Sequence, residues 1–87
     1  MADDTGAPAA EVDALGLLCP LPIVRTRRVL ERLPPGSVVV LWADDEAIEK
    51  DLPAWCAGDG PELLGMERST HPSGRQAFRC LVRRRDP

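Results

Sequence analysis

The chain has 87 residues, of which 44% are hydrophobic, and a formal net charge of -3 at pH 7. This length allows one small domain with a compact core and excludes a multidomain enzyme. No apolar stretch approaches the roughly 18 residues that a membrane span needs. The acidic start MADDTGAPAA lacks the basic and apolar regions of a secretory signal. We therefore expect a cytoplasmic protein that makes no membrane contact.

The three cysteines, Cys19, Cys56 and Cys80, are odd in number and far apart. This pattern does not fit the paired framework of small secreted domains, so at least one thiol should be free. There is no CxxC pair and His71 is the single histidine, so a zinc site would lack its usual close ligand pairs. We expect no metal and no other cofactor.

The first elements are a tail, a strand and a helix. Residues 1–9 are small or polar and predict a flexible N-terminal tail before a single domain over residues 10–85. The apolar residues of EVDALGL predict a short strand that Gly16 closes. Apolar residues then recur at helical spacing from Leu21 to Leu33, and PPG at 34–36 ends that helix.

Arginines mark the opposite side of this helix. Arg25, Arg28 and Arg32 share one face, and residues 20–33 carry four arginines against Glu31, a net charge of +3. We predict that this face docks an acidic partner, although a solvated amphipathic helix explains the pattern equally well.

The remaining chain predicts a strand, a helix and a hairpin. SVVVLWA at 37–43 is a continuous apolar run, typical of a strand buried on both faces. Asp44 or Asp45 can cap a second helix, which Pro53 should kink or divide. Two alternating stretches, 62–69 and 76–83, flank the loop THPSGR and predict an antiparallel pair. The inward residues of the last strand are expected to be Phe78, Cys80 and Val82.

The expected order is strand, helix, strand, helix, strand, strand. Two helices can cover one face of a four-stranded mixed sheet, which gives an α+β two-layer sandwich. The first two strands should be parallel through a right-handed crossover.

Cys19 falls where the first strand has ended and the helix begins. The helix dipole and the unpaired amides there favour a thiolate, with a pKa below the reference of about 8.5. Pro20 at the first helical position and Pro22 restrain the backbone and carry no N–H. We therefore predict Cys19 as the nucleophile, with the amide of Leu21, and then that of Ile23, as donors to its sulfur.

The cysteines and His71 also have structural interpretations that involve no chemistry. Cys19 can instead be a small buried residue, and Cys56 and Cys80 fall on apolar faces and predict core packing. Cys56 can act as a resolving thiol only if it is exposed near Cys19. His71, in a Pro-Gly loop, is expected to be a solvated turn residue.

The chain from about residue 11 to residue 84 resembles the TusA/SirA family of small bacterial sulfur carriers. The likeness rests on Asp13, Gly16, the Cys19-Pro20-Leu21-Pro22 motif, Gly36, Ala43-Asp44-Asp45, Asp51-Leu52-Pro53 and Cys56. It implies a βαβαββ sandwich and a persulfide on Cys19, with Gly16, Pro20, Leu21 and Pro22 supporting the site. It also implies a cysteine desulfurase or rhodanese-like sulfur donor and a thiol-bearing acceptor, in tRNA thiolation, molybdenum-cofactor synthesis or sulfur oxidation.

Two positions depart from the family pattern. Leu21 is often acidic and Leu18 is often basic in the TusA branch, so the rim of this site is more apolar. This weakens the tRNA-thiolation assignment more than the sulfur chemistry. The loop THPSGR is also longer than is usual.

The alternative function is a regulatory module that binds RNA or protein through its arginines, with the cysteine incidental. Arg25, Arg27 and Arg28 with the tail 83–85 would then contact phosphates. The negative net charge and the scarcity of aromatics for base stacking argue against direct nucleic-acid binding.

Overall fold

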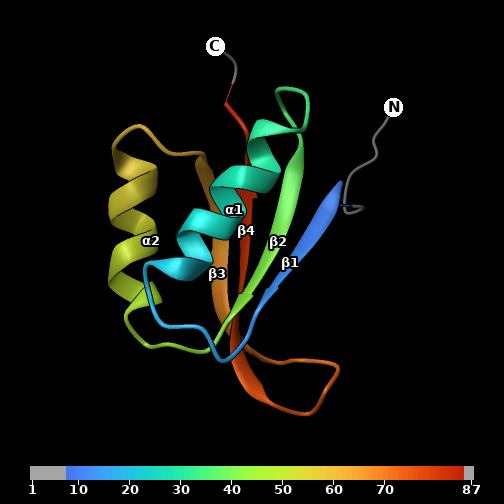
Figure 1. The fold of residues 1–87 in the computed structure, drawn as a ribbon, viewed down its shortest axis with the longest axis vertical. Coiled ribbons are helices and arrows are strands. Elements are labelled where there is room, and N and C mark those ends of the chain that lie inside the picture. The colour runs from blue at the N-terminus through green and yellow to red at the C-terminus, as the bar shows by residue number, and fades with distance from the viewer. Residues whose placement is uncertain (1–7, 86–87) are drawn as a thin grey trace.

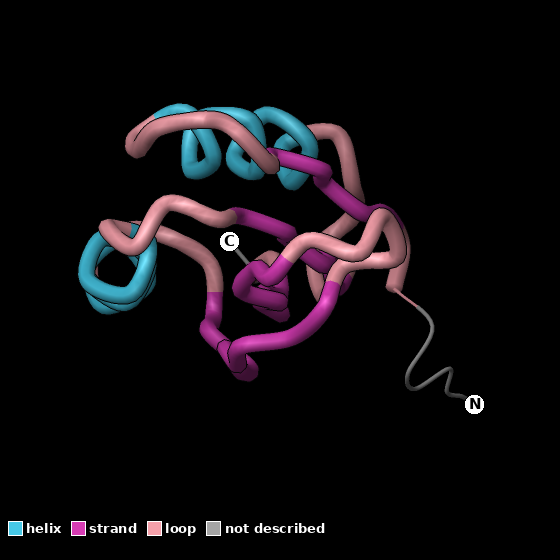
Figure 2. Tube along the Cα trace, turned by 90° about the horizontal axis from the view of Figure 1, so that it is seen from below, coloured by secondary structure: helices cyan, strands magenta, loops and turns pink. Residues whose placement is uncertain are grey.

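The computed structural model describes residues 8–85 and places two helices on one face of a four-stranded sheet (Figures 1 and 2). The elements are β1 (Ala10–Ala14), α1 (Leu21–Glu31), β2 (Val38–Ala43), α2 (Ile48–Ala57), β3 (Glu62–Thr70) and β4 (Gln76–Arg83). The strand order is β1-β2-β4-β3, with β1 and β2 parallel and the other pairs antiparallel. The predicted α+β sandwich is confirmed. Most of the predicted tail lies outside the described residues, and no described helix is long and apolar enough to cross a membrane.

The main core lies between the sheet and the two helices. The register pairs Leu41 with Cys80 and Val39 with Val82, so alternate residues of the two central strands meet on the helix-covered face. These four side chains are completely buried, and Phe78 joins them at 3% exposure. The predicted inward face of the last strand is therefore confirmed.

A second, smaller cluster covers the open face of the sheet. Val40, Trp42 and Ala77 are buried there, with Leu15 and Leu81 packed against them. Because β2 is buried on both faces, its sequence reads as an unbroken apolar run.

The helices differ from the expectation at their ends. α1 begins at Leu21, with Pro20 as its N-cap residue, and ends at Glu31, so Pro20 is not the first helical residue. Thr26 is fully buried, and its hydroxyl donates a 2.8 Å hydrogen bond to the Pro22 carbonyl. α2 runs undivided through Pro53, and its N-cap residue is Ala47, with no side-chain cap. The expected aspartate N-cap and the division at Pro53 are therefore wrong.

The basic run after β4 makes internal contacts. Arg83 pairs with Glu62 at 3.1 Å, and the Arg84 guanidinium donates to the carbonyl of Leu33, just past α1. Arg85 donates 3.0 Å and 2.9 Å hydrogen bonds to the carbonyls of Cys56 and Gly60 at the end of α2. Cations at these carbonyl ends favour the helices.

Candidate sulfur-transfer site

The loop that carries Cys19 consists of two consecutive turns between β1 and α1. The Leu17 amide donates to the Ala14 carbonyl at 3.2 Å, and the Leu21 amide donates to the Leu18 carbonyl at 2.9 Å. Gly16 has φ of 80°, a left-handed conformation that favours glycine. The peptide bond between Cys19 and Pro20 is cis. The chain therefore presents Cys19 one residue before the N-cap of α1.

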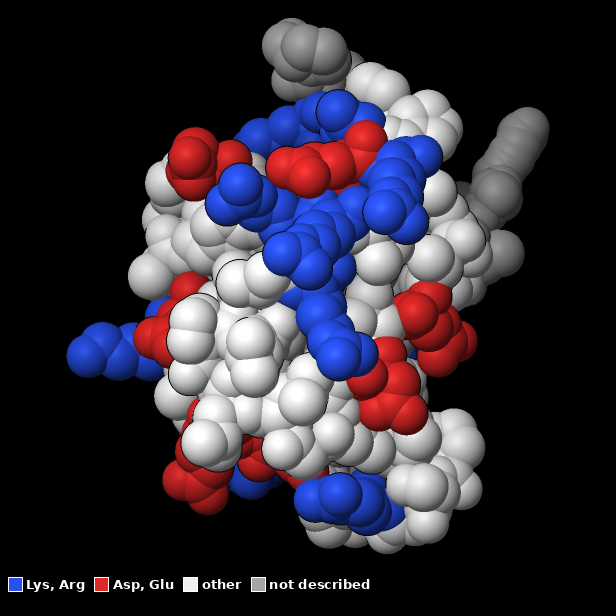
Figure 3. Space-filling view, in the orientation of Figure 1, with Lys and Arg blue, Asp and Glu red and all other residues white. Residues whose placement is uncertain are grey.

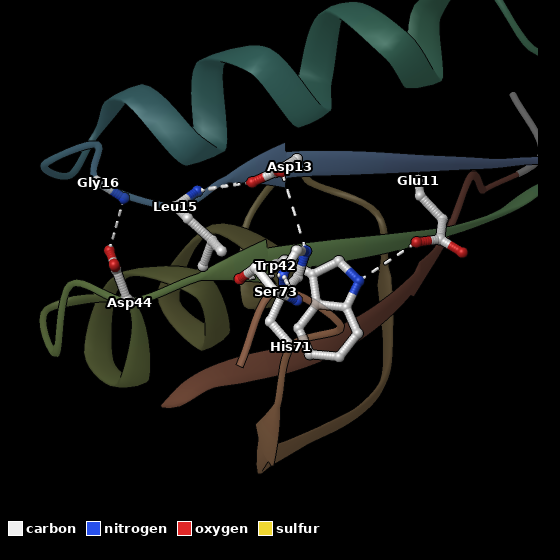
Figure 4. Close-up of polar contacts among 8 residues, drawn as sticks. All are labelled: Glu11, Asp13, Leu15, Gly16, Trp42, Asp44, His71 and Ser73. Atoms are coloured by element: carbon white, nitrogen blue, oxygen red, sulfur yellow. Dashed lines mark hydrogen bonds and ion pairs between the residues drawn. The ribbon is translucent and has the colours of Figure 1, made fainter. Parts of the chain in front are cut away.

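Two consecutive aspartates hold both ends of this loop. The carboxylate of Asp44 accepts the Gly16 amide at 2.9 Å, as Figure 4 shows, and that of Asp45 accepts the Cys19 amide at 2.8 Å. Asp45 also accepts the Ala47 amide at 3.0 Å. These backbone hydrogen bonds lower the pKa of Asp45, because they favour its charged form. The Asp-Asp pair thus fixes the Cys19 loop and the turn before α2 together.

The shift in the pKa of Cys19 is opposite to the expectation. Burial raises the pKa of its thiol, and the nearby carboxylates of Asp45 and Asp51 raise it further, Asp51 also through a side-chain hydrogen bond. The predicted lowered pKa is therefore wrong. The reason is that the β2–α2 loop and α2 bring negative charge to the sulfur, which the helix end alone did not reveal.

The two amides that were predicted to donate to the Cys19 sulfur differ in their observed partners. The Leu21 amide is already bonded to the Leu18 carbonyl, so its assignment to the sulfur is wrong. The Ile23 amide has no backbone partner among residues 8–85, and its role as a donor stays a prediction. Pro22, in the first turn of α1, is buried, while Pro20 is exposed.

Apolar side chains surround the partly buried thiol. Leu18 is 72% exposed and Leu21 is 50% exposed, and Val24 extends this surface along α1. Exposed leucines on both sides of a cysteine suit contact with another protein, where their apolar area is removed from water.

The other two cysteines lie in the core, as predicted. Cys56 is 4% exposed, so it does not meet the condition set for a resolving thiol, and burial raises the pKa of its thiol. Cys80 is completely buried, and burial, followed by the effect of Cys56, raises its pKa to about 12.

The β3–β4 loop is ordered against the open face, contrary to the expectation for His71. Its side chain is 14% exposed and its ring meets that of Trp42 edge-on, with 4.9 Å between centroids. Nδ1 accepts the Ser73 amide at 3.0 Å, and Nε2 lies 3.9 Å from a carboxylate oxygen of Asp13 (Figure 4). His71 is therefore a packed residue and not a solvated one.

This loop also reaches the support of the cysteine. The guanidinium of Arg75 bonds to the carboxylate of Asp44, whose other oxygen holds Gly16. Sequence reasoning missed this contact and the roles of Asp45 and Asp51. The signals were the density of carboxylates from residue 44 to residue 51 and the place of Asp44-Asp45 and Asp51 in the motifs of the family resemblance.

The three predicted docking arginines do share one side of α1. Arg25, Arg28 and Arg32 are exposed, line one groove beside β1, and make no ion pair within residues 8–85. Figure 3 shows basic side chains in a stripe over α1, with acidic groups beside it on the side of β1. Within the same described range, no three His, Cys, Asp or Glu side chains are grouped to hold a metal ion.

The comparisons agree with this fold. The chain is similar to the crystal structure of a SirA-like protein from Desulfitobacterium hafniense, with 24% identity and a TM-score of 0.63 over 88% of this chain and 99% of that one. At this identity the likeness supports the fold alone. The family model described as Sulfurtransferase TusA matches residues 10–84. The chain therefore belongs to the TusA sulfurtransferase family, whose role is to carry sulfur between donors and acceptors.

Proposed function

We propose that Cys19 accepts a sulfane sulfur as a persulfide and passes it to a thiol of an acceptor protein. The observation that carries this proposal is the contrast among the three free cysteines. Cys19 is the one partly exposed thiol, on a loop held by Asp44 and Asp45, whereas Cys56 and Cys80 are buried. We place the relay in the cytoplasm, because three free thiols suit a reducing compartment.

The transfer balances without a cofactor. The Cys19 sulfur attacks the outer sulfur of a donor persulfide, so a new S–S bond forms on Cys19 and the donor's S–S bond breaks. The donor's inner sulfur leaves as a thiolate and takes up the proton that Cys19 gives up. The acceptor thiol repeats the same exchange on the Cys19 persulfide, and no electrons are gained or lost overall.

A raised thiol pKa requires that the proton leave as the bond forms, because the thiolate is the nucleophile. Asp51, whose side chain interacts with the thiol, would take up that proton and return it to the leaving thiolate of the donor. Asp45, which is committed to the amides of Cys19 and Ala47, is a positioning residue. We therefore propose that the Cys19 thiol loses its proton during the transfer, and not that it rests as a thiolate.

The surroundings of Cys19 favour protein partners. We propose a cysteine desulfurase or a rhodanese-like protein as the sulfur donor and a thiol-bearing protein as the acceptor. Leu18 and Leu21 offer an apolar contact around the sulfur, and Arg25, Arg28 and Arg32 offer positive charge farther along α1. Apolar area supplies affinity, and the charges select the partner and speed its approach.

The RNA-binding alternative loses support from the contacts of Arg83, Arg84 and Arg85. These side chains pair with Glu62 or donate to backbone carbonyls at the ends of both helices. They are therefore not a free basic tail for phosphates.

The proposal is tested by intact mass after incubation with a cysteine desulfurase and cysteine, and separately with a rhodanese and thiosulfate. The wild-type chain should gain the mass of one sulfur, Cys19→Ser should gain none, and Cys56→Ala should load like the wild type. A loaded chain should lose that mass when a thiol-bearing acceptor is added. Loading on Cys56, or no loading from either donor class, would remove the proposal.

A further inference from the structure

A groove lies between β1 and α1. Its volume is about 380 Å³ and its lining comprises Glu11, Val12, Asp13, Arg25, Arg28, Val29 and Arg32. One wall is therefore the side of α1 that carries the three docking arginines, and the other wall is β1. The charged side chains of this groove take no part in the sulfur chemistry or in the packing of the core.

β1 is an edge strand along this groove. The strand order places β2 on one side of it and no strand of residues 8–85 on the other. An edge strand leaves a row of backbone N–H and C=O groups unpaired, and an extended segment of another chain can bond to them. The free edge of β1 can supply backbone hydrogen bonds to such a segment, and the adjacent helix α1 can supply side-chain contacts.

The charges of the two walls lie on opposite faces of the sheet. Asp13 is paired with Trp42 in the register, and the Glu11 carboxylate accepts the Trp42 indole N–H at 3.2 Å, so both acids project to the open face. The arginines belong to α1, which covers the other face. Successive side chains of a strand alternate between these faces.

We propose that this groove receives an extended segment of a partner protein as a fifth strand, with acidic residues at alternate positions toward α1 and basic residues at the positions between them. The acidic side chains would meet Arg25, Arg28 and Arg32, and the basic ones would meet Glu11 and Asp13. The inference rests on the proposed function only in naming the partner as a sulfur donor or acceptor.

The spacing of the charges fits this arrangement. Arg25 and Arg32 are seven residues apart, or about 10 Å along a helix. Side chains on one face of a strand repeat about every 7 Å, so two acidic residues fall within the reach of the arginines. Glu11 and Asp13 are themselves two residues apart on one strand and match two basic residues of the segment.

A polyanion fits the same groove poorly. Asp13 is 65% exposed, and its negative charge lies across the groove from the arginines. A continuous row of phosphates would meet repulsion from this carboxylate and from Glu11 along β1. The mixed charge of the groove therefore favours a protein segment over RNA.

Docking in the groove would also serve the sulfur transfer. α1 begins at Leu21, two residues after Cys19, and Arg25 lies about one turn farther along. A segment held there keeps its protein beside the thiol and raises the effective concentration of the reacting sulfur.

The test uses two octapeptides of equal composition, one with alternating Glu and Lys and one with four Glu followed by four Lys. NMR of the ¹⁵N-labelled full chain should show the alternating peptide shifting amides of β1 and α1 and slowing hydrogen exchange in β1. The block peptide should bind at least about fivefold more weakly, because its charges face the wrong walls. Equal binding of the two peptides, or shifts at β3 instead of β1, would overturn the proposal.

Variants on α1 provide the matched control. Arg28→Gln should weaken the alternating peptide by about two- to fivefold, the size expected of one exposed ion pair. Arg27→Gln, on the same helix but paired with Glu31 at 3.3 Å and facing another groove, should leave it unchanged. Equal losses in both variants, or tighter binding of an eight-nucleotide uridine RNA than of the peptide, would contradict the inference. Because the assay reads peptide binding, its failure is separate from a failure of sulfur loading.

Discussion

The loop around Cys19 and the core around Cys80 place the same side chain in two contrasting environments. Both thiols have a raised pKa, but the main additional cause at Cys19 is a pair of carboxylates, whereas Cys80 is completely enclosed and shifted to about 12. The difference between them is therefore one of exposure and of nearby negative charge, and not of a low pKa. Under the proposed function, the reactivity of Cys19 comes from the exposure of its sulfur and from the groups around it.

Alkylation rates provide the largest test of this contrast. In the native protein, iodoacetamide should modify Cys19 on the order of a thousandfold faster than Cys80, because Cys80 reacts only after an opening that costs a large part of the global stability. Mass spectrometry of digested samples measures each site. In denaturant the two rates should converge. Equal rates under native conditions would show that the contrast does not exist in solution.

Serine substitutions at the two cysteines compare their contributions to the free energy of unfolding. Cys80→Ser should lower the free energy of unfolding by about 2 kcal/mol, because it buries a hydroxyl among Leu41 and the other core residues without a designed partner. Cys19→Ser should change it by less than about 0.5 kcal/mol, as for a surface substitution. Urea unfolding followed by circular dichroism measures both. A larger loss at Cys19 would mean that its role is structural.

The smallest effect concerns the carboxylate beside the sulfur. Asp51→Asn removes a negative charge and a hydrogen bond that raise the pKa of the Cys19 thiol, so that pKa should fall. The thiolate fraction at neutral pH then rises, and the alkylation profile of Cys19 moves to lower pH. Asp59→Asn, the same change in an exposed residue beyond the end of α2, is the control and should leave the profile in place. A profile that moves to higher pH in Asp51→Asn would show that the carboxylate does not act on the thiol.

Most of the fold follows from local patterns in the sequence. Three patterns indicate which side of an element is buried: the helical spacing from Leu21, the apolar run of β2 and the alternation around Cys80. Each can be read within the element's own residues. The order of these elements then leaves few ways to cover one face of a sheet. Cys19 could be singled out for the same reason, because its unusual place between a strand and two prolines is a local feature.

The surroundings of Cys19 required the tertiary structure. Asp45 and Asp51 lie 26 and 32 residues beyond the cysteine, and their density looked like the first turn of a helix. His71 was expected in water because Pro and Gly flank it, but the loop folds back onto Trp42. In each case the surroundings of the residue depend on a contact with a distant part of the chain. The spacing of residues along the sequence does not show such contacts.

The strand order has a consequence for biosynthesis. β4 leaves the ribosome after the other three strands of this sheet, yet it lies between β2 and β3 and supplies Phe78, Cys80 and Val82 to the core. Until it emerges, β3 has no strand to join, and the helix ends lack the cations of Arg84 and Arg85. The nascent chain therefore reaches its native packing only after residues 76–85 have emerged, and a chain interrupted before β4 lacks the strand that joins β2 to β3.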